Sequence, residues 1–260
     1  MPIHIDQLGK AIILGNEKLR IVSLVPSQTE LLFDLGLSEE VVGITKFCIH
    51  PETWFKTKTS VGGTKNVRIE KVRSLNPTLI IANKEENTKA DLEALETIAP
   101  IWISDVRSIP QAFDMIEKIG ALTGKVNEAK RINEQIQVVF DGLIKYKKTR
   151  RVLYVIWQNP IMVAASDTFI DSMLQILGYV NACGHLTRYP ELSEQMLIDL
   201  NPDSLFLSSE PFPFKEKHIE YFRKLLPKTK ILLVNGELFS WYGSRLLQTK
   251  KLEQLLTMQE

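Results

Sequence analysis

The stretch LNPTLII, residues 75–81, returns as LNPDSLF, residues 200–206. The two prolines, Pro77 and Pro202, are 202 − 77 = 125 residues apart. This spacing exceeds a solenoid repeat of about 20–50 residues but suits one domain that is copied once. A proline disfavours helical geometry in the residue before it. The motif therefore predicts, in each copy, a helix that ends, an extended residue and then a buried strand.

The sequence around the two copies also repeats, in the same order. RIVSLVP, residues 20–26, matches RVLYVIWQNP, residues 151–160, because each has an arginine, an apolar run and a turn with proline. TELLFDLGL, residues 29–37, matches TFIDSMLQILGY, residues 168–179, because each predicts a helix that ends in Leu-Gly. Three features in one order predict an internal duplication.

Strands and helices are predicted to alternate in both halves, which is typical of an open and mostly parallel sheet. Ser27 and Glu30 have the spacing of a capping box for the first helix, and Gly36 suits its C-terminus. Strands are predicted at 20–26, 41–45, 78–83, 101–105, 151–157 and 230–235, and a hairpin at 2–6 and 11–14. Helices are predicted at 27–36, 69–75, 91–98, 168–179, 218–227 and 244–258, with a further helix before the second Leu-Asn-Pro.

A long helical region separates the two halves. Within 126–148, apolar residues recur at spacings of three and four, as on one face of a helix. At 1.5 Å per residue this helix would be roughly 30 Å long. We therefore expect an α/β protein with two Rossmann-like lobes, divided as 1–107, 108–148 with the long helix, and 149–260.

Composition excludes some partners. The chain has 260 residues, 44% hydrophobic content and a net charge of +1, so no strong field attracts nucleic acid or an anionic membrane. No run of 18 apolar residues predicts a membrane span. The first residues, MPIHIDQLGKAIILG, lack the pattern of a signal peptide. Cys48 and Cys183 are expected to be free thiols.

The predicted ligand site lies at the strand ends. In open α/β sheets, ligands bind beyond the carboxyl ends of the strands. We expect a cleft between the lobes, lined by aromatic and polar loops. These loops are residues 26–28, 46–50, 60–67, 83–87, 157–159, 184–192, 208–214 and 236–243.

Three stretches resemble one protein family: RIVSLVPSQTELLFDLG, VVGITKFCIHP and VGGTKNVRIEKVRSLNPTLIIA. They are similar to the substrate-binding proteins of ABC importers for vitamin B12, haem and ferric siderophores, the helical-backbone metal receptors. The resemblance runs from about residue 3 to the C-terminus. It implies two lobes bridged by one long helix, no catalysis, no required cofactor, and a periplasmic or cell-surface location. The missing signal peptide leaves a cytoplasmic location open.

Within that family the similarity is greatest to the members that bind vitamin B12. The resemblance therefore implies a corrinoid ligand such as cobalamin, with haem or a ferric siderophore as alternatives. Pro26 and Phe47 match positions that contact the ligand, and Thr64 stands where these members have a cleft tryptophan.

The resemblance also implies a membrane partner. Members of the family dock onto an ABC permease through one acidic residue in each lobe. The first position falls on Glu70, seven residues before Pro77. The second falls on Gln195, seven residues before Pro202, with Glu194 adjacent. We expect a monomer that contacts the permease through both lobes, and no nucleic-acid partner.

Cys48 and His50 form a C-x-H pair beside a proline. Thiolate and imidazole both suit cobalt, iron, copper or zinc, and residues two apart in an extended loop point the same way. Two ligands do not complete a metal site. A metal held by a macrocycle needs only one axial ligand, which favours His50. The alternative is a cytoplasmic metal-chelate sensor or a metalloenzyme that uses both residues.

Several other side chains are candidate ligand contacts. Trp157 and Trp241 could stack on a planar macrocycle, although tryptophans also fill cores. No G-x-S-x-G, Walker A, H-E-x-x-H or C-x-x-C motif indicates an enzyme. His218, on a predicted amphipathic helix, is expected at the surface. The remaining candidates are Ser27, Glu85, Arg188 and Tyr242.

Overall fold

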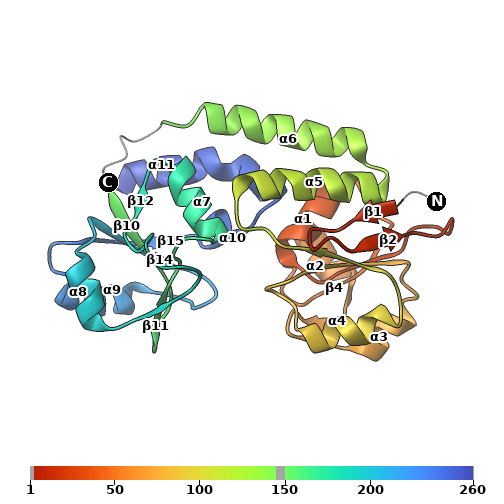
Figure 1. Ribbon diagram of the computed structural model, residues 1–260, viewed down its shortest axis with the longest axis horizontal. Helices are drawn as coiled ribbons and strands as arrows, with labels where there is room; N and C mark the ends of the chain where they lie inside the picture. Colours follow the sequence, from red (N-terminus) through yellow and green to blue (C-terminus); the bar gives the residue numbers. More distant parts are fainter. Residues whose placement is uncertain (1–2, 145–149, 260) are drawn as a thin grey trace. The chain divides into compact units, whose positions relative to one another are not determined.

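The computed structural model describes residues 3–144 and 150–259, and the chain divides into two compact units. Each unit has its own mostly parallel sheet flanked by helices, which confirms the predicted two-lobed α/β class (Figure 1). Unit 1 comprises Met1–Val106, Pro110–Ile136 and Tyr242–Leu246; unit 2 comprises Arg107–Ile109, Gln137–Trp241 and Leu247–Glu260. Among the described residues, no helix is long and apolar enough to cross a membrane.

Unit 1 is built on five parallel strands in the order β5-β4-β3-β8-β9. These strands are β3 (Ile21–Ser23), β4 (Val41–Ile44), β5 (Thr59–Ser60), β8 (Leu79–Asn83) and β9 (Ile101–Ser104). Two hairpins accompany them: β1 (Ile3–Ile5) with β2 (Ala11–Ile13), as predicted, and β6 (Gly62–Gly63) with β7 (Asn66–Val67). The helices are α1 (Pro26–Asp34), α2 (Glu52–Thr57), α3 (Ile69–Ser74), α4 (Lys89–Glu96) and α5 (Ile109–Thr123). Helices α3 and α4 pack against each other (Figure 1).

Unit 2 has a six-stranded sheet in the order β13-β11-β10-β14-β15, with β12 also paired to β10. These strands are β10 (Arg151–Trp157), β11 (Ile161–Val163), β12 (Val180–Asn181), β13 (Glu191–Leu192), β14 (Ser204–Ser208) and β15 (Lys230–Val234). The helices are α7 (Phe169–Ile176), α8 (Glu194–Leu200), α9 (Glu216–Leu225), α10 (Glu237–Ser240) and α11 (Thr249–Gln259).

The two sheets share a core of the same topology. The parallel order β4-β3-β8-β9 in unit 1 corresponds to β12-β10-β14-β15 in unit 2. Unit 2 adds β11 and β13, which pair antiparallel beside β10. The shared order supports the duplication that the sequence predicts.

The repeated Leu-Asn-Pro motif ends a helix in each unit. Asn76 has φ 46° and Asn201 has φ 42°, so both adopt the left-handed conformation. The prediction of an extended residue at this position is therefore wrong. Asparagine tolerates left-handed geometry better than most residues because its short side chain bonds locally. The Leu-Gly helix ends behave alike, since Gly36 and Gly178 have φ 79° and 86°.

An arginine at the start of β3 or β10 contacts each of these helix ends: Arg20 directly precedes β3, and Arg151 is the first residue of β10. Arg20 donates from Nη2 to the Leu75 carbonyl at 2.5 Å and from Nε to the Asn76 carbonyl at 3.0 Å. Arg151 donates from Nη1 to the Asn201 carbonyl at 3.4 Å. Carbonyls at a helix C-terminus lack helical partners, so these guanidinium groups satisfy some of them.

Three predicted helix details differ in the structure. Helix α1 begins at Pro26 with Val25 as its N-cap and no side-chain cap, so Ser27 lies inside the helix and the capping box is wrong. The predicted helix 126–148 is α6 (Val126–Asp141), which ends before Gly142; residues 145–148 of that prediction lie outside the described residues. The predicted terminal helix 244–258 begins as a 3₁₀ helix, Ser244–Gln248, before α11.

Residues Tyr242–Leu246, near the end of the chain, pack with unit 1. Arg245 Nε lies 2.8 Å from Glu30 Oε2 of α1, and both side chains are largely buried. Gly243, with φ 109°, lies where a Cβ would be 3.4 Å from Leu31 Cβ. Unit 1 therefore takes part of its structure from a segment 215 residues away from Glu30.

Candidate functional site

Buried polar side chains gather at the carboxyl edge of the unit 1 sheet. Ser23, Asn83 and Ser104 are the last residues of β3, β8 and β9, and all three are buried. Buried polar groups are costly unless they are hydrogen-bonded. Their partners therefore show how this edge is organised.

One hydrogen-bond network links α1 to two loops. Gln28 Nε2 donates to Ser104 Oγ, which also accepts from Asn83 Nδ2 at 3.0 Å. Asn83 N donates to Asn87 Oδ1 at 2.9 Å, and Asn87 Nδ2 donates to the Thr64 carbonyl at 2.9 Å. The network fixes the 62–64 and 83–87 loops against the sheet. Thr64, a predicted ligand contact, is buried.

Other predicted contacts of unit 1 lie around this network. Pro26 is half-buried at the start of α1, and Ser27 is buried in its first turn. Glu85 is exposed, and its main-chain N donates to Asn83 Oδ1 at 2.8 Å. The exposed Glu85 carboxylate is the one charged group among these three.

Cys48 is fully buried in a second polar cluster. Thr29 Oγ1 donates to its Sγ at 3.1 Å, and Thr45 Oγ1 lies 3.2 Å from the same sulfur. Burial raises the pKa of the Cys48 thiol, although the two threonine hydrogen bonds act in the opposite direction. The geometry is that of a neutral core thiol, and it gives no support to Cys48 as a metal ligand.

The loop that contains Cys48 is a turn and not an extended segment. Cys48 N donates to the Thr45 carbonyl at 3.1 Å, so the prediction that residues 48 and 50 point the same way is wrong. Phe47 is 49% exposed and Ile49 is 42% exposed, while His50 is half-buried. Lys46 Nζ lies 5.0 Å from the centre of the Phe47 ring. The turn thus presents an apolar surface beside an imidazole.

An aromatic cluster lies at the carboxyl edge of the unit 2 sheet. Trp157 ends β10 and is 39% exposed. Its ring centre lies 5.4 Å from that of Phe212, in the loop after β14. The ring centre of Phe212 also lies 4.6 Å from that of Phe214 and 5.3 Å from that of His218. His218 is half-buried among these rings and accepts from Lys215 N at 2.7 Å, so it lies only partly at the surface.

Trp241 and Tyr242 are both buried, and they belong to different units. Trp241 Nε1 donates to Glu210 Oε1 at 3.0 Å. Tyr242 directly precedes the Gly243 that approaches α1. Their burial gives less support to direct ligand contact than the exposure of Trp157 does.

Arg188 shares a carboxylate with a second arginine. Arg188 Nη1 donates to the Asp167 carbonyl at 2.5 Å and lies 3.7 Å from Asp167 Oδ2. Arg107 Nη1 lies 2.9 Å from the same Oδ2. Asp167 and Arg188 have φ 57° and 64°. Arg188 is therefore held by contacts within unit 2.

The predicted docking residues lie on equivalent helices. Glu70 is the second residue of α3, and Gln195 is the second residue of α8. Glu70 is exposed beside Arg73, at 3.4 Å. Glu194 accepts from Tyr221 Oη at 2.5 Å, and Gln195 Nε2 donates to Asp199 Oδ1 at 2.8 Å. Helices α3 and α8 both lead into Leu-Asn-Pro, so they carry these residues at matching positions.

The part of the chain that the structure describes contains no group of three or more His, Cys, Asp or Glu side chains that could hold a metal ion.

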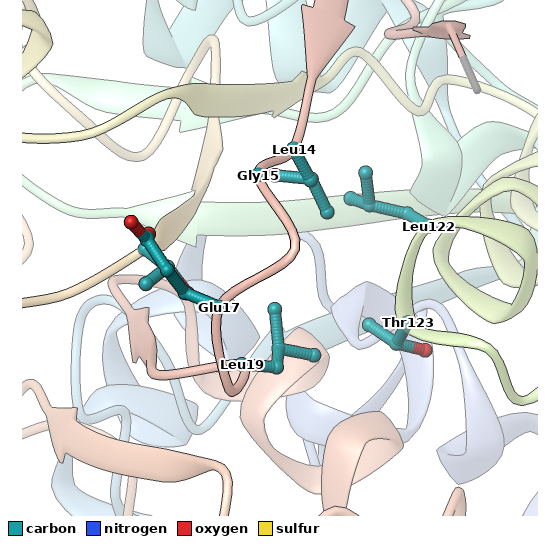
Figure 2. A pocket seen from close by; sticks show the side chains of 7 residues that line it. Leu14, Gly15, Glu17, Leu19, Leu122 and Thr123 are labelled. Carbon is teal, nitrogen blue, oxygen red and sulfur yellow. The ribbon is translucent and has the colours of Figure 1, made fainter. Parts of the chain in front are cut away.

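A pocket of about 210 Å³ lies at the opposite edge of the unit 1 sheet (Figure 2). Leu19 and Thr78, which precede β3 and β8, line it together with Leu122 of α5. Figure 2 shows the Glu17 carboxylate turned away from Leu122 and Thr123. The pocket is distant from the carboxyl-edge loops along the strands, and nothing in its lining indicates chemistry.

The prediction covered part of the two edges. Gln28, Asn83 and Asn87 fall within the predicted loops 26–28 and 83–87, whereas Ser104, the last residue of β9, was not predicted as part of the site. Phe212 and Glu210 lie in a loop that was predicted only as a whole. Their roles depend on contacts with α10 and β10, which no local pattern reveals.

The chain is similar to known proteins over most of its length. The chain is 28% identical over 217 residues to an uncharacterised ABC transporter substrate-binding lipoprotein of Bacillus subtilis, covering 78% of this chain and 68% of that one. It is 26% identical over 195 residues to the vitamin B12-binding protein of Vibrio vulnificus, covering 73% and 71%.

A crystal structure has a similar fold. It is that of a possible iron-binding, periplasmic solute-binding protein from Staphylococcus epidermidis, with a TM-score of 0.79 and 26% identity, covering 92% of this chain and 99% of that one. Residues 21–224 match the sequence profile of periplasmic binding proteins. The chain therefore belongs to the periplasmic binding protein family, whose members bind solutes for transport and are not enzymes.

Proposed function

We propose that the solute captured by this ABC-importer binding protein is a metal chelate, with a corrinoid such as cobalamin as the first candidate. The protein itself needs no cofactor in this role. The carboxyl-edge loops of each unit are the proposed contact surfaces, and the protein is proposed to act as a monomer.

The turn at residues 46–50 is the observation that carries the proposal. It exposes Phe47 and Ile49 beside the half-buried imidazole of His50. An exposed aromatic ring can stack on a planar macrocycle, and a neutral imidazole is a good ligand for cobalt or iron. The buried cluster of Cys48, Thr29 and Thr45 holds this turn in place, so little ordering would be needed on binding.

The names of two similar proteins support the choice of ligand class. The relative from Vibrio vulnificus is a vitamin B12-binding protein, which favours a corrinoid. The similar structure from Staphylococcus epidermidis is a possible iron-binding protein, which supports haem or a ferric siderophore as the second candidate. The burial of Cys48 and a family whose members are not enzymes both argue against the metalloenzyme alternative.

Delivery would require a membrane permease. We propose that α3 and α8 dock onto it, with Glu70 on one helix and Glu194 with Gln195 on the other. The exposure of these side chains and their equivalent positions in the duplicated units support this arrangement. Charge reversal at Glu70 should weaken stimulation of the permease ATPase without changing chelate affinity.

Isothermal titration calorimetry with cyanocobalamin, haemin and ferrichrome tests the ligand class. Phe47→Ala should weaken binding about tenfold, since it removes a stacking surface. Phe55→Ala is the matched control, because Phe55 is exposed to a similar extent, 47%, but lies on α2. Absence of binding for all three chelates, or equal losses in both variants, would overturn the proposal.

A spectrum tests the axial role of His50. Aquocobalamin and haem change their visible absorption when an imidazole replaces bound water. The change should occur with the wild-type protein and disappear in His50→Ala. If His50→Ala gives the same spectrum as the wild type, chelate binding stands but axial ligation by His50 does not.

A further inference from the structure

A carboxylate joins two loops at the carboxyl edge of unit 2. Glu210 lies in the loop after β14, and its Oε1 accepts from Ser240 Oγ at 2.7 Å and from Trp241 Nε1 at 3.0 Å. Ser240 and Trp241 lie at the end of α10, in the segment after β15. Hydrogen bonds to a carboxylate are stronger than those between neutral groups. These two bonds therefore tie neighbouring strand ends together.

The backbone under this carboxylate is also closely fitted. A Cβ on Gly236 would lie 2.5 Å from Glu210 Cγ and 2.5 Å from Ser208 Oγ. Ser208 Oγ in turn donates to the Glu210 carbonyl at 2.5 Å, and Gly236 N donates to Ser209 Oγ at 2.9 Å. The 208–210 segment therefore has little freedom to shift.

The same loop carries the ring that meets Trp157. Phe212 follows Glu210 by two residues, and its ring packs edge-on against Trp157 at 5.4 Å with an interplanar angle of 69°. Trp157 is the more exposed member of the pair. The exposed indole thus packs against the same loop that carries Glu210.

We propose that Glu210 is a positioning residue: by holding Ser240 and Trp241, it places Phe212 so that Trp157 presents an aromatic surface to a planar ligand. In this arrangement Trp241 is a buried anchor and Trp157 is the contact. The contact between this surface and a ligand rests on the proposed function. The orientation of Trp157 by Glu210 is independent of it.

Fluorine NMR of the protein labelled with 5-fluorotryptophan tests the positioning role without any ligand. The four tryptophans give four signals, which single Trp→Phe variants assign. Glu210→Ala should shift the signals of Trp241 and Trp157 and leave those of Trp54 and Trp102 in unit 1 unchanged. Glu210→Gln should restore both signals, because its amide oxygen accepts the same two bonds.

The matched control is Glu220→Ala, which removes an exposed glutamate of α9. It should leave all four signals in place. If Glu210→Ala shifts Trp241 but not Trp157, the proposal is wrong. Should Glu210→Ala fail to fold, Trp241→Phe removes one of the two donors and must still shift the Trp157 signal.

Affinity for cyanocobalamin and haemin tests the ligand surface. Glu210→Ala should weaken binding of whichever probe the wild type binds by about tenfold, and Glu210→Gln by less than about twofold. Unchanged affinity in Glu210→Ala would overturn the aromatic surface as a contact. If the wild type binds neither probe, nor ferrichrome, while the Trp157 signal still responds, the positioning role stands and the chelate proposal fails.

Discussion

Replacing Asn76 or Asn201 by alanine should destabilise the protein, whereas replacing either by glycine should not. Both residues adopt the left-handed backbone conformation, with φ 46° and 42°. They lie just after the C-terminal ends of α3 and α8, and each precedes a proline. A left-handed conformation costs an ordinary L-residue about 1–2 kcal/mol. Asparagine recovers part of this cost through local hydrogen bonds. Alanine should therefore lower the free energy of unfolding by about 1 kcal/mol at each site, and glycine, which lacks a Cβ, should stay near the wild type.

Urea unfolding monitored by tryptophan emission measures this difference. Trp54 and Trp102 report on unit 1, and Trp157 and Trp241 report on unit 2, so two transitions are fitted where they do not coincide. Asn127→Ala is the control, because Asn127 is an exposed helical residue of α6. That change should be neutral or slightly stabilising, since alanine favours a helix. The reasoning fails if glycine is as destabilising as alanine, or if the control costs as much as the test.

The other predictions concern buried groups. Arg245→Met should lower the free energy of unfolding by about 3–5 kcal/mol, because it removes the cation that pairs with the buried Glu30 carboxylate. The double variant Arg245→Met with Glu30→Leu should regain part of this loss in the same urea series. Equal stability of the single and double variants would contradict the pairing. Cys48 and Cys183 should resist a disulfide reagent in the native protein and react in guanidinium, because burial raises the pKa of both thiols, that of Cys183 to about 12. The stability from these neutral thiols is present below the unfolded-state pKa of 9.0 and is lost as the pH rises above it. The urea midpoint should therefore fall at alkaline pH, and it should fall less steeply in Cys183→Ala. Gly236→Ala should lower the free energy of unfolding by about 1–3 kcal/mol through overpacking, which a lower thermal midpoint would reveal. An unchanged midpoint would show that the loop after β14 moves to accommodate the added methyl group.

The architecture was largely predictable because the signals for it are local and repeated. The apolar runs at 20–26 and 151–157 became β3 and β10, and both Leu-Gly pairs ended helices at left-handed glycines. The short strands β11 and β13 were not predicted. Each has only two or three residues, too few for a periodic signal, and they exist because β10 offers a free edge near Trp157.

The sequence predicts the candidate site as a set of loops but does not reveal the contacts within it. Phe47 is exposed as expected for a ligand contact, while its neighbour Cys48 lies in the core. The sequence C-x-H does not distinguish an extended loop from a turn, and the hydrogen bond from Cys48 N to the Thr45 carbonyl makes it a turn. Likewise Trp241 could not be separated from Trp157 by sequence, because its burial depends on Glu210, 31 residues away.

The Glu30–Arg245 ion pair has a consequence for biosynthesis. A ribosome adds Arg245 to the chain 215 positions after Glu30. While almost all of unit 2 is being translated, α1 therefore carries Glu30 without Arg245, its ion-pair partner in the folded protein. Domains usually fold in the order in which they emerge, but here unit 1 cannot reach its final state until residues 242–246, which follow most of unit 2, have been made.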